Sequence, residues 1–350
     1  MSSNLLVYGA TGFVGGHIAR TAVRSGLPII LAGRDRAKLD SLAAELGTER
    51  RAFGLADASA IRGALVGVAA VLNCAGPFKR TAEPLASACL SAGAPYLDIT
   101  GEIPVFEALQ AKDAEAKARG VMLLPGAGFD VVPTDCLALH LKRRLPSATR
   151  LRLAFQLVGP AGPPPGTQRT AIELLDFGDR VRRNGKLVRP DRLSRISIDF
   201  GRGPVEAAPL PWGDVFTAFY STGIPDIVTY IAVPPALSRQ LAVMRALAPL
   251  ANWPGVRDLM RLSVRPGPIP ALRARTSTHV WGEVVDEEGR SASARLHGPE
   301  AGVEWTTACA LGAARKALNG LAPPGYQTPA SAYGPDFVLE AEGVTREDVA

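Results

Sequence analysis

The feature that most constrains this fold is a glycine turn directly after a short apolar run at the N-terminus. Leu5 to Tyr8 have the character of a buried strand, and Gly9-Ala10-Thr11-Gly12-Phe13-Val14-Gly15 follows at once. Glycines at this spacing let a strand turn sharply into a helix and let backbone amides approach a pyrophosphate. The GxxGxxG spacing departs from the more common GxGxxG, but its place between a strand and a helix predicts a dinucleotide site over a purely structural turn.

Short β-rich apolar runs alternate with longer helix-period segments over residues 1–134, a pattern typical of a parallel sheet covered on both faces. The helices include Arg36 to Leu46 and Pro104 to Arg119. The predicted strands are Leu5 to Tyr8, Pro28 to Ala32, Arg51 to Leu55, Ala70 to Asn73, Pro95 to Ile99 and Val121 to Pro125. The fold class is therefore α/β, with a doubly wound Rossmann domain over residues 1–134.

The rhythm changes after Pro133, which predicts a second, α+β domain over residues 135–325 that binds substrate and forms a dimer. Alternating stretches indicate a largely antiparallel sheet, with Thr276 to Val285 paired in a hairpin with Ser291 to His297. Residues 326–350 are expected to pack back on the first domain. The remaining predicted elements are the helix Thr134 to Arg144, the strands Arg150 to Val158 and Arg192 to Phe200, the loop Gly159 to Gly166, and covering helices at Gln168 to Phe177, Pro235 to Ala248 and Gly302 to Leu318.

The composition is that of an ordinary globular chain, with 350 residues and 47% hydrophobic content. No apolar run approaches the roughly 18 residues of a membrane span, and the N-terminus lacks the pattern of a secretory signal. The four cysteines, Cys74, Cys89, Cys136 and Cys309, are scattered, so neither a metal site nor a disulfide framework is indicated. We expect a cytoplasmic protein without a transmembrane segment.

The formal charge of +6 is concentrated partly in Lys142 to Arg144, followed by Arg150 and Arg152. No helix-turn-helix, zinc-finger or RNA-binding signature accompanies these charges, and basic residues at the end of a helix interact favourably with its dipole. We interpret this run as a solvated helix end and expect no nucleic-acid partner.

The end of the second predicted strand indicates which dinucleotide binds. NAD-preferring sites carry an acidic residue there for the ribose hydroxyls, whereas this strand ends in Leu31-Ala32-Gly33 and is followed by Arg34. Asp35 is better explained as the N-cap of the next helix. Arg34, with Arg36 or Lys38, can pair with a 2′-phosphate, which favours NADP(H) over NAD(H).

A second predicted cofactor segment is Asn73-Cys74-Ala75-Gly76-Pro77, which follows the fourth strand at the carboxyl edge of the sheet. We expect it to border the nicotinamide ribose. The alternative is a Pro/Gly turn that opens the helix Thr81 to Ala92. Cys74 is expected to be a small buried residue and not a nucleophile, because no His partner is near it in sequence.

Carboxylates also follow the next two strands: Asp98 and Glu102 after the fifth, and Asp130 after the sixth. The carboxyl ends of parallel strands share one edge, so these groups are candidates for proton transfer together with Tyr220, a phenol of the second domain. Loop capping or backbone hydrogen bonding explains each of them equally well. The YxxxK pair of short-chain dehydrogenases does not occur.

Five blocks in this order, YGATGFVG, LAGR, NCAGPF, YLDITGE and GAGFDVVPTD, give the chain a family resemblance. It resembles the saccharopine dehydrogenase-like oxidoreductases, including the trans-acting enoyl reductases of bacterial lipid synthesis. The blocks cover about the first 136 residues, and a weaker similarity continues through Ala218 to Pro225. The resemblance implies an NADP-binding domain joined to a variable second domain, and it leaves the substrate open.

Three functions remain in contention. The apolar stretches Val215 to Pro235 and Leu237 to Leu250 favour an apolar enoyl or carbonyl substrate, although a core or dimer face also explains them. An opine or saccharopine-type imine reductase would need clustered arginines such as Arg180, Arg182 and Arg183 for its carboxylates. The third is a non-catalytic NADP(H)-binding sensor or scaffold protein. We expect a homodimer in each case.

Overall fold

The computed structural model describes residues 4–173, 180–190, 193–233, 260 and 262–349. The chain divides into two compact units. The first unit comprises Met1–Val132 and Gly302–Ala332, and the second comprises Pro133–Ala301 and Tyr333–Ala350.

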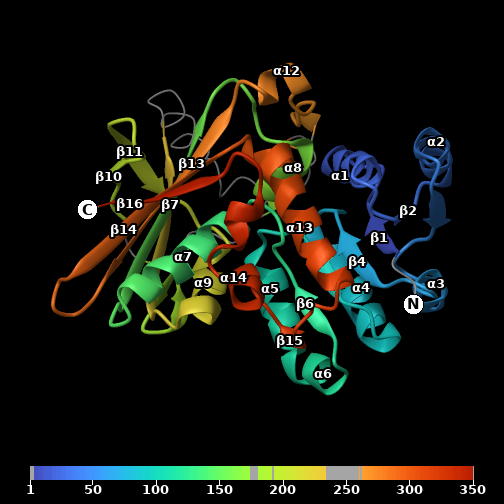
Figure 1. Ribbon diagram of the computed structural model, residues 1–350, viewed down its shortest axis with the longest axis horizontal. Coiled ribbons are helices and arrows are strands. Elements are labelled where there is room, and N and C mark those ends of the chain that lie inside the picture. Colours follow the sequence, from blue (N-terminus) through green and yellow to red (C-terminus); the bar gives the residue numbers. More distant parts are fainter. Residues whose placement is uncertain (1–3, 174–179, 191–192, 234–259, 261, 350) are drawn as a thin grey trace. The chain divides into compact units, whose positions relative to one another are not determined.

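The first unit is built on a seven-stranded parallel sheet in the order β15-β6-β5-β4-β1-β2-β3 (Figure 1). Every residue of β1, β2, β4, β5 and β6 is buried, as the apolar runs predicted for a sheet covered on both faces. The Rossmann fold predicted from the sequence is confirmed. The strands are β1 Leu5–Tyr8, β2 Ile29–Gly33, β3 Glu49–Ala52, β4 Ala70–Asn73, β5 Tyr96–Asp98, β6 Met122–Leu124 and β15 Gly325–Tyr326.

Helix α13 packs against α1 and over β4 and β5, whereas α4 packs against α3 and α5. The single helix predicted over residues 104–119 is divided into two helices, α5 and α6. Asp113, the first residue of α6, accepts a hydrogen bond from the Tyr326 amide of β15 at 2.9 Å. The helices of this unit are α1 Phe13–Arg24, α2 Arg36–Leu46, α3 Ala58–Ala64, α4 Phe78–Ala92, α5 Ile103–Gln110, α6 Asp113–Ala118, α13 Thr306–Leu318 and α14 Pro329–Tyr333, the last of which ends just inside the second unit.

The C-terminal third of the chain differs from the sequence-based assignment in two respects. Helix α13, expected to cover the second sheet, lies in the first unit, where its small side chains Ala310, Ala313 and Ala314 are buried. The segment after residue 325 is shared between the units: β15 pairs with β6, whereas β16 (Thr345–Val349) joins the second sheet. An apolar helix face and a two-residue strand do not specify the sheet against which they pack.

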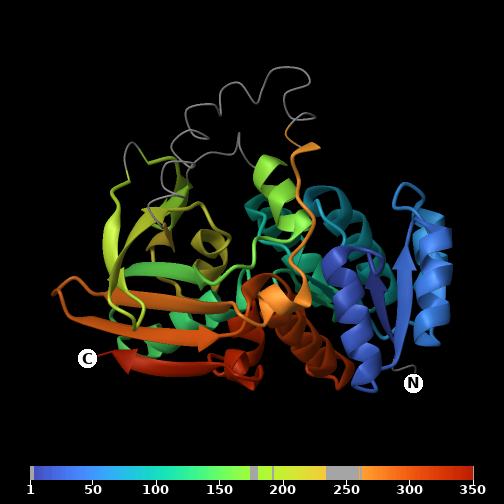
Figure 2. The ribbon, with the colours of Figure 1, turned by 90° about the horizontal axis from the view of Figure 1, so that it is seen from above.

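The second unit contains a nine-stranded mixed sheet whose main path runs β10-β11-β12-β7-β13-β14-β16 (Figure 2). Its described neighbours are antiparallel except for β7 and β12, and the hairpin of β13 with β14 is confirmed. The strands are β7 Arg150–Val158, β8 Val181–Arg183, β9 Lys186–Val188, β10 Ile196–Asp199, β11 Pro204–Pro209, β12 Asp226–Ala232, β13 Ser277–Val285, β14 Ser291–Gly298 and β16.

Opposite faces of this sheet are covered differently. Helix α7 (Val132–Arg144) lies close to one face, since a Cβ at Gly282 would be 2.7 Å from a methyl of Leu141. On the other face Phe200, Val228 and Tyr230 form part of an apolar core. The other elements are α8 Pro165–Glu173, α9 Asp214–Thr222, α12 Pro270–Arg273, a π-helical turn Ala301–Trp305 and a 3-10 helix Phe337–Glu340; the helix expected at residues 235–248 lies outside the described residues.

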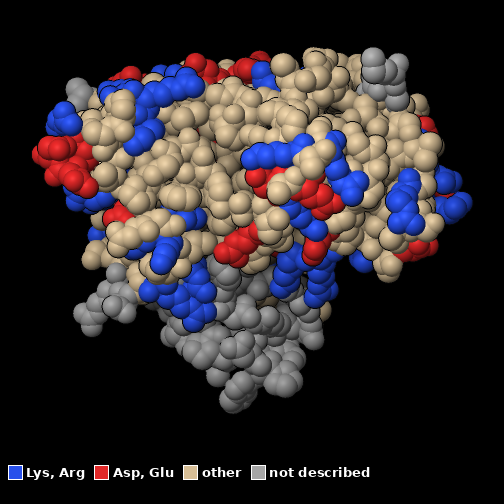
Figure 3. Space-filling view, turned by 90° about the horizontal axis from the view of Figure 1, so that it is seen from below, with Lys and Arg blue, Asp and Glu red and all other residues tan. Residues whose placement is uncertain are grey.

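The basic run at the end of α7 is engaged within its own unit. Lys142 Nζ donates to the Ala148 carbonyl at 2.9 Å, and Arg144 pairs with Asp348 at 3.1 Å. On the face shown in Figure 3, Lys and Arg side chains are interspersed with Asp and Glu and do not form one continuous cationic surface. Within the described part of the chain, no helix has the length and apolar character needed to cross a bilayer.

Candidate functional site

The glycine turn after β1 packs tightly against itself and against the segment that follows β4. Gly9 has φ +83°, a conformation that side chains with a Cβ rarely adopt, and a Cβ there would lie 2.8 Å from the Ala75 nitrogen. A Cβ at Gly15 would collide with the Gly9 carbonyl oxygen and lie 3.1 Å from the Cβ of Cys74. Two of the three glycines are therefore required by the packing of the turn itself.

Gly12 is different, because it is exposed and faces open space. It is the N-cap of α1 with φ −76°, and a Cβ there would meet only the Gly9 carbonyl oxygen, at 3.1 Å. No side chain caps α1 and no acidic residue occupies its first turn. The first amides of a helix and the positive end of its dipole favour an anion, so this cradle fits a pyrophosphate. Thr11 and Phe13 flank it at the surface, while Ala10 is buried.

The end of β2 carries the positive charge predicted for a 2′-phosphate site. Arg34 follows the buried Gly33 and is exposed. Burial raises the pKa of the Tyr8 hydroxyl, and the Arg34 charge partly opposes that shift. The Asp35 carboxylate accepts from the Lys38 amide at 3.1 Å, as expected of an N-cap, and is thereby occupied at the start of α2.

The segment 73–77 is held from within by a buried amide. Asn73 Oδ1 accepts from the Ala75 amide at 3.0 Å, and Nδ2 donates to Thr81 Oγ1 and to the Tyr96 hydroxyl, both at 3.1 Å. Thr81 Oγ1 in turn donates to the Ala75 carbonyl at 2.6 Å. Burial raises the pKa of the Cys74 thiol, so it remains protonated and is a poor nucleophile. Gly76 is exposed, and Pro77 is the N-cap of α4.

Asp98 ends β5 and ties the end of this strand to the end of β6. Its Oδ2 accepts from the Tyr96 hydroxyl at 2.8 Å, and its Oδ1 accepts from the amides of Thr100 (3.0 Å) and Gly126 (2.9 Å). The carboxyl is fully buried, which raises its pKa to about 7 although the two amides oppose the shift. Asp98 therefore organises the edge of the sheet.

Glu102 is the N-cap residue of α5 and is 2% exposed. Its two oxygens accept from the first amides of a different helix, α4: Oε1 from Phe78 and Oε2 from Lys79, each at 2.9 Å. This is the capping alternative that the sequence left open for this residue, but the helix that it caps is its neighbour.

Asp130 lies beyond β6 and is partly exposed. A Cβ on Gly101 would be 3.0 Å from Asp130 Oδ2, so the glycine leaves room for this carboxyl. Enclosure by the protein and, secondly, the charge of Glu102 raise the pKa of Asp130 to about 7. A carboxyl with this pKa is poised to exchange a proton near neutrality.

The first unit thus brings together Asn73, Asp98, Glu102 and Asp130 at the carboxyl edge of its sheet. Tyr220 belongs to α9 of the second unit, where its ring is 41% exposed and stacks near Phe216 and Phe219 at centroid distances of 4.9 and 5.7 Å. Sequence reasoning missed Tyr96, the phenol between Asn73 and Asp98. Its position two residues before Asp98 on the same strand was the available signal, because such residues face one side of the sheet.

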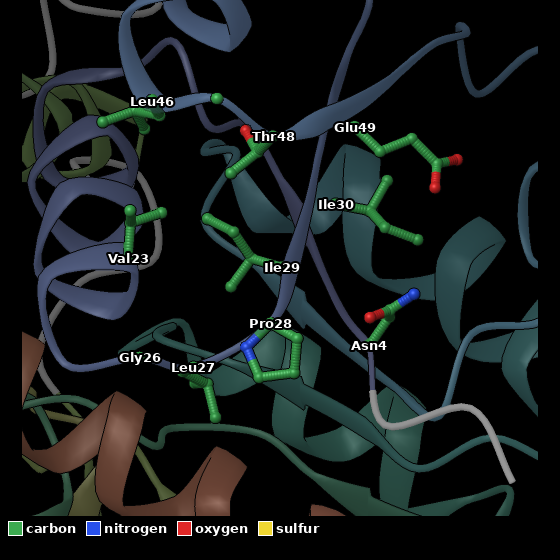
Figure 4. Close-up of a pocket in the computed structure, with 11 residues that line it drawn as sticks. Asn4, Val23, Gly26, Leu27, Pro28, Ile29, Ile30, Leu46, Thr48 and Glu49 are labelled. Atoms are coloured by element: carbon green, nitrogen blue, oxygen red, sulfur yellow. The ribbon is translucent and has the colours of Figure 1, made fainter.

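A hollow in the first unit lies away from the glycine turn. A cavity of about 420 Å³ lies at the amino ends of the strands, bordered by Val23, Pro28, Leu46 and Thr48 (Figure 4). Ligands of doubly wound folds bind at the carboxyl ends, where the glycine turn is. The cavity is therefore not the dinucleotide site.

Comparison with known proteins agrees with the geometry. Residues 5–124 match the family model of the saccharopine dehydrogenase NADP binding domain. The chain is 31% identical over 201 residues to the saccharopine dehydrogenase-like oxidoreductase of Homo sapiens, which covers 51% of this chain and 46% of that protein. It is 36% identical over 152 residues to a trans-acting enoyl reductase of Mycobacterium leprae, covering 41% of this chain and 36% of that protein. The chain thus spans less than half the length of these relatives.

Among solved structures, apo saccharopine dehydrogenase (L-Glu forming) from Saccharomyces cerevisiae has the same fold. The two superpose with a TM-score of 0.68 over 99% of this chain and 100% of the other, at 13% sequence identity. The family model and the curated relatives confirm the resemblance drawn from the sequence: residues 5–124 match the saccharopine dehydrogenase NADP binding domain, and the cofactor that this match indicates is NADP(H).

Proposed function

We propose that the protein is an NADPH-dependent reductase of an apolar enoyl or carbonyl substrate. The observation that supports this proposal is that one unit contains two features. They are an uncapped helix N-terminus at Gly12 and a carboxyl, Asp130, whose pKa lies near neutrality. When bound, NADPH supplies a hydride. The residues proposed to hold it are those of the glycine turn, Gly33 with Arg34, and the 73–77 segment.

The chain must then supply a proton, and Asp130 is the group proposed to do so. Hydride addition to a conjugated alkene or a carbonyl leaves a pair of electrons on carbon or oxygen, which takes up one proton to complete the reduction. Asp130 combines partial exposure with a raised pKa, as a general acid requires near neutral pH. Asp98 is fully buried and Glu102 is 2% exposed, so both are less accessible than Asp130, and Tyr220 remains the alternative donor.

The second unit is proposed to bind the substrate and to form the homodimer. The name of the relative from Mycobacterium leprae, a trans-acting enoyl reductase, supports an enoyl substrate. Within α9 the apolar side chains Val215, Phe216 and Ala218 are buried, so exposed contact falls to Tyr220 and the partly exposed Phe219. The second apolar stretch, residues 237–250, lies outside the described residues.

An imine reductase acting on amino-acid adducts is less well supported, because a key arginine is already engaged. Arg182 is 5% exposed; its Nε donates to the Val215 carbonyl at 2.8 Å and its Nη1 to the Gly185 carbonyl at 2.6 Å. Its guanidinium also lies 4.1 Å from the ring centroid of Phe219. A guanidinium held in this way is not presented to a substrate carboxylate.

Turnover separates these functions. NADPH is mixed with panels of enoyl thioesters, ketones and amino-acid imines, and loss of the reduced-nicotinamide absorbance is followed in single-turnover mode. We expect reduction of enoyl or carbonyl compounds, with Asp130→Asn slowing hydride transfer by about 10²- to 10⁴-fold at unchanged NADPH affinity. Tyr220→Phe is the matched control, and a large loss there in place of Asp130→Asn would move the donor to Tyr220. Tight NADPH binding without turnover on any panel would favour the non-catalytic sensor or scaffold.

A further inference from the structure

Glu102 is fixed from both directions by hydrogen bonds of its own backbone. Its amide donates to Thr100 Oγ1 at 3.0 Å, and its carbonyl accepts from the Val105 amide at 2.9 Å as α5 begins. An N-cap residue usually turns its side chain onto its own helix. The Glu102 side chain instead accepts from the amides of Phe78 and Lys79 at the start of α4.

The residues that Glu102 contacts, Phe78 and Lys79, directly follow the 73–77 segment in the chain. Helix α4 begins one residue after Pro77, so its first amides fix the end of the 73–77 segment. The same segment is in contact with the glycine turn, because Ala75 fills the space beside Gly9. A movement of the first residues of α4 would therefore displace Ala75, against which the glycine turn packs.

The carboxylate of Glu102 also belongs to a cluster of acidic groups. Asp98 ends β5, Glu102 is the N-cap residue of α5 and Asp130 follows β6, and the Asp130 carboxyl packs against Gly101, the residue before Glu102. Both Glu102 oxygens act as acceptors, which is the hydrogen-bonding capacity of an ionised carboxylate. Lys79 on α4 is exposed to solvent, where water screens its charge.

We propose that Glu102 is a positioning residue that clamps the 73–77 segment against the glycine turn and keeps a negative charge beside Asp130. This inference rests on the proposed function in so far as Asp130 is the acid. The physical consequence is electrostatic: a like charge disfavours ionisation of a neighbouring carboxyl, and Glu102 contributes in this way to the raised pKa of Asp130.

Two substitutions separate the clamp from the charge. Glu102→Gln keeps the length of the side chain and one acceptor oxygen but removes the charge, whereas Glu102→Asp keeps the charge and is too short to reach both amides. Selective ¹³C labelling of aspartate carboxyls, with Asp130→Asn to assign the resonance, follows the ionisation of Asp130 directly. NADPH affinity is measured on the same samples by fluorescence titration.

We expect the ionisation midpoint of Asp130 to fall by about one pH unit in Glu102→Gln and to change less in Glu102→Asp. NADPH affinity should fall in both variants, by about tenfold where one amide bond is lost. A midpoint and an affinity that both stay at the wild-type values in Glu102→Gln would overturn the proposal. The proposal would also be overturned if Glu102→Gln lost hydride transfer at every pH while the Asp130 midpoint and the NADPH affinity stayed unchanged, because that result makes Glu102 the proton donor.

Neither readout needs a substrate, so failure of the proposed reduction would be recognised separately, as absence of turnover in the wild-type protein. Thermal melts check the fold of each variant. If Glu102→Gln does not fold, Gly101→Ala provides the second test, because its Cβ would lie 3.0 Å from Asp130 Oδ2 and displace that carboxyl without removing the clamp. A shifted Asp130 midpoint at wild-type NADPH affinity is then expected, and an unchanged midpoint would contradict the proposed contact.

Discussion

At the scale of single residues, the three glycines of the turn do different work. Gly9 and Gly15 are surrounded by backbone, whereas Gly12 opens to solvent. The sequence predicted the turn and its ligand from the glycine spacing together with its place between a strand and a helix. It could not rank the glycines, because the atoms that crowd Gly9 belong to Ala75, which is distant in sequence. The same holds for Glu102, whose partners Phe78 and Lys79 precede it by more than twenty residues.

This difference predicts opposite outcomes for two substitutions. Gly12→Val should abolish NADPH binding with a smaller change in the free energy of unfolding than Gly15→Ala, because the φ of Gly12 suits any residue and its Cβ would meet only the Gly9 carbonyl oxygen, at 3.1 Å. Gly15→Ala should lower the free energy of unfolding by about 1–3 kcal/mol, because its Cβ meets backbone. Urea unfolding and NADPH titration of both variants check this. Native cofactor affinity in a folded Gly12→Val protein would show that the turn is structural only.

At the scale of elements, strands were predicted more reliably than their packing partners. The buried strands of the first sheet read as apolar runs, and α2 begins after its predicted N-cap, Asp35, and has the predicted bounds. Helix α13 was assigned to the wrong sheet because an apolar face is equally suited to any partner. The β13 and β14 hairpin was predicted by alternation, but the contact that its register creates between two histidines was not.

That contact predicts acid sensitivity of the second unit. His279 and His297 are directly opposite across the hairpin, with Nδ1 atoms 2.7 Å apart. The polar and charged groups around the pair are Ser277, Arg295, Glu347, Asp199 and Arg202. Burial, then the charges of His297 and Arg202, lower the pKa of His279. A base whose folded pKa is depressed contributes stability above its unfolded pKa of about 6.5, and this is lost as the pH falls through the folded value.

Urea unfolding of the wild-type protein and of His279→Gln at pH 7.5 and 5 measures this contribution. We expect the wild type to lose more stability on acidification than the variant, which carries no titrating group at this position. The comparison must be made between the two proteins, because Asp98 and Asp130, with raised pKa values, act with the opposite sign and stabilise the fold as the pH falls. Equal losses in both proteins would remove the histidine pair as the cause.

At the scale of the whole molecule, the cofactor half could be predicted from the sequence and the substrate half could not. Pyrophosphate recognition depends on backbone geometry, which glycines in a strand-turn-helix context reveal. The proposed substrate recognition would depend on side chains of the second unit, which is assembled from distant segments. Of the three arginines that the sequence offered for a carboxylate, Arg182 is occupied by backbone carbonyls. Fold similarity to saccharopine dehydrogenase at 13% identity therefore leaves the substrate to experiment.

The central claim is that this molecule takes NADPH and distinguishes it from NADH through Arg34. Isothermal titration calorimetry of both cofactors with the wild-type protein and with Arg34→Ala tests it most directly. We predict that NADPH binds the wild type more tightly than NADH by about 1–3 kcal/mol, the range of a charge-assisted bond to the 2′-phosphate, and that Arg34→Ala removes most of this difference. Equal affinities of the wild-type protein for the two cofactors would contradict the account.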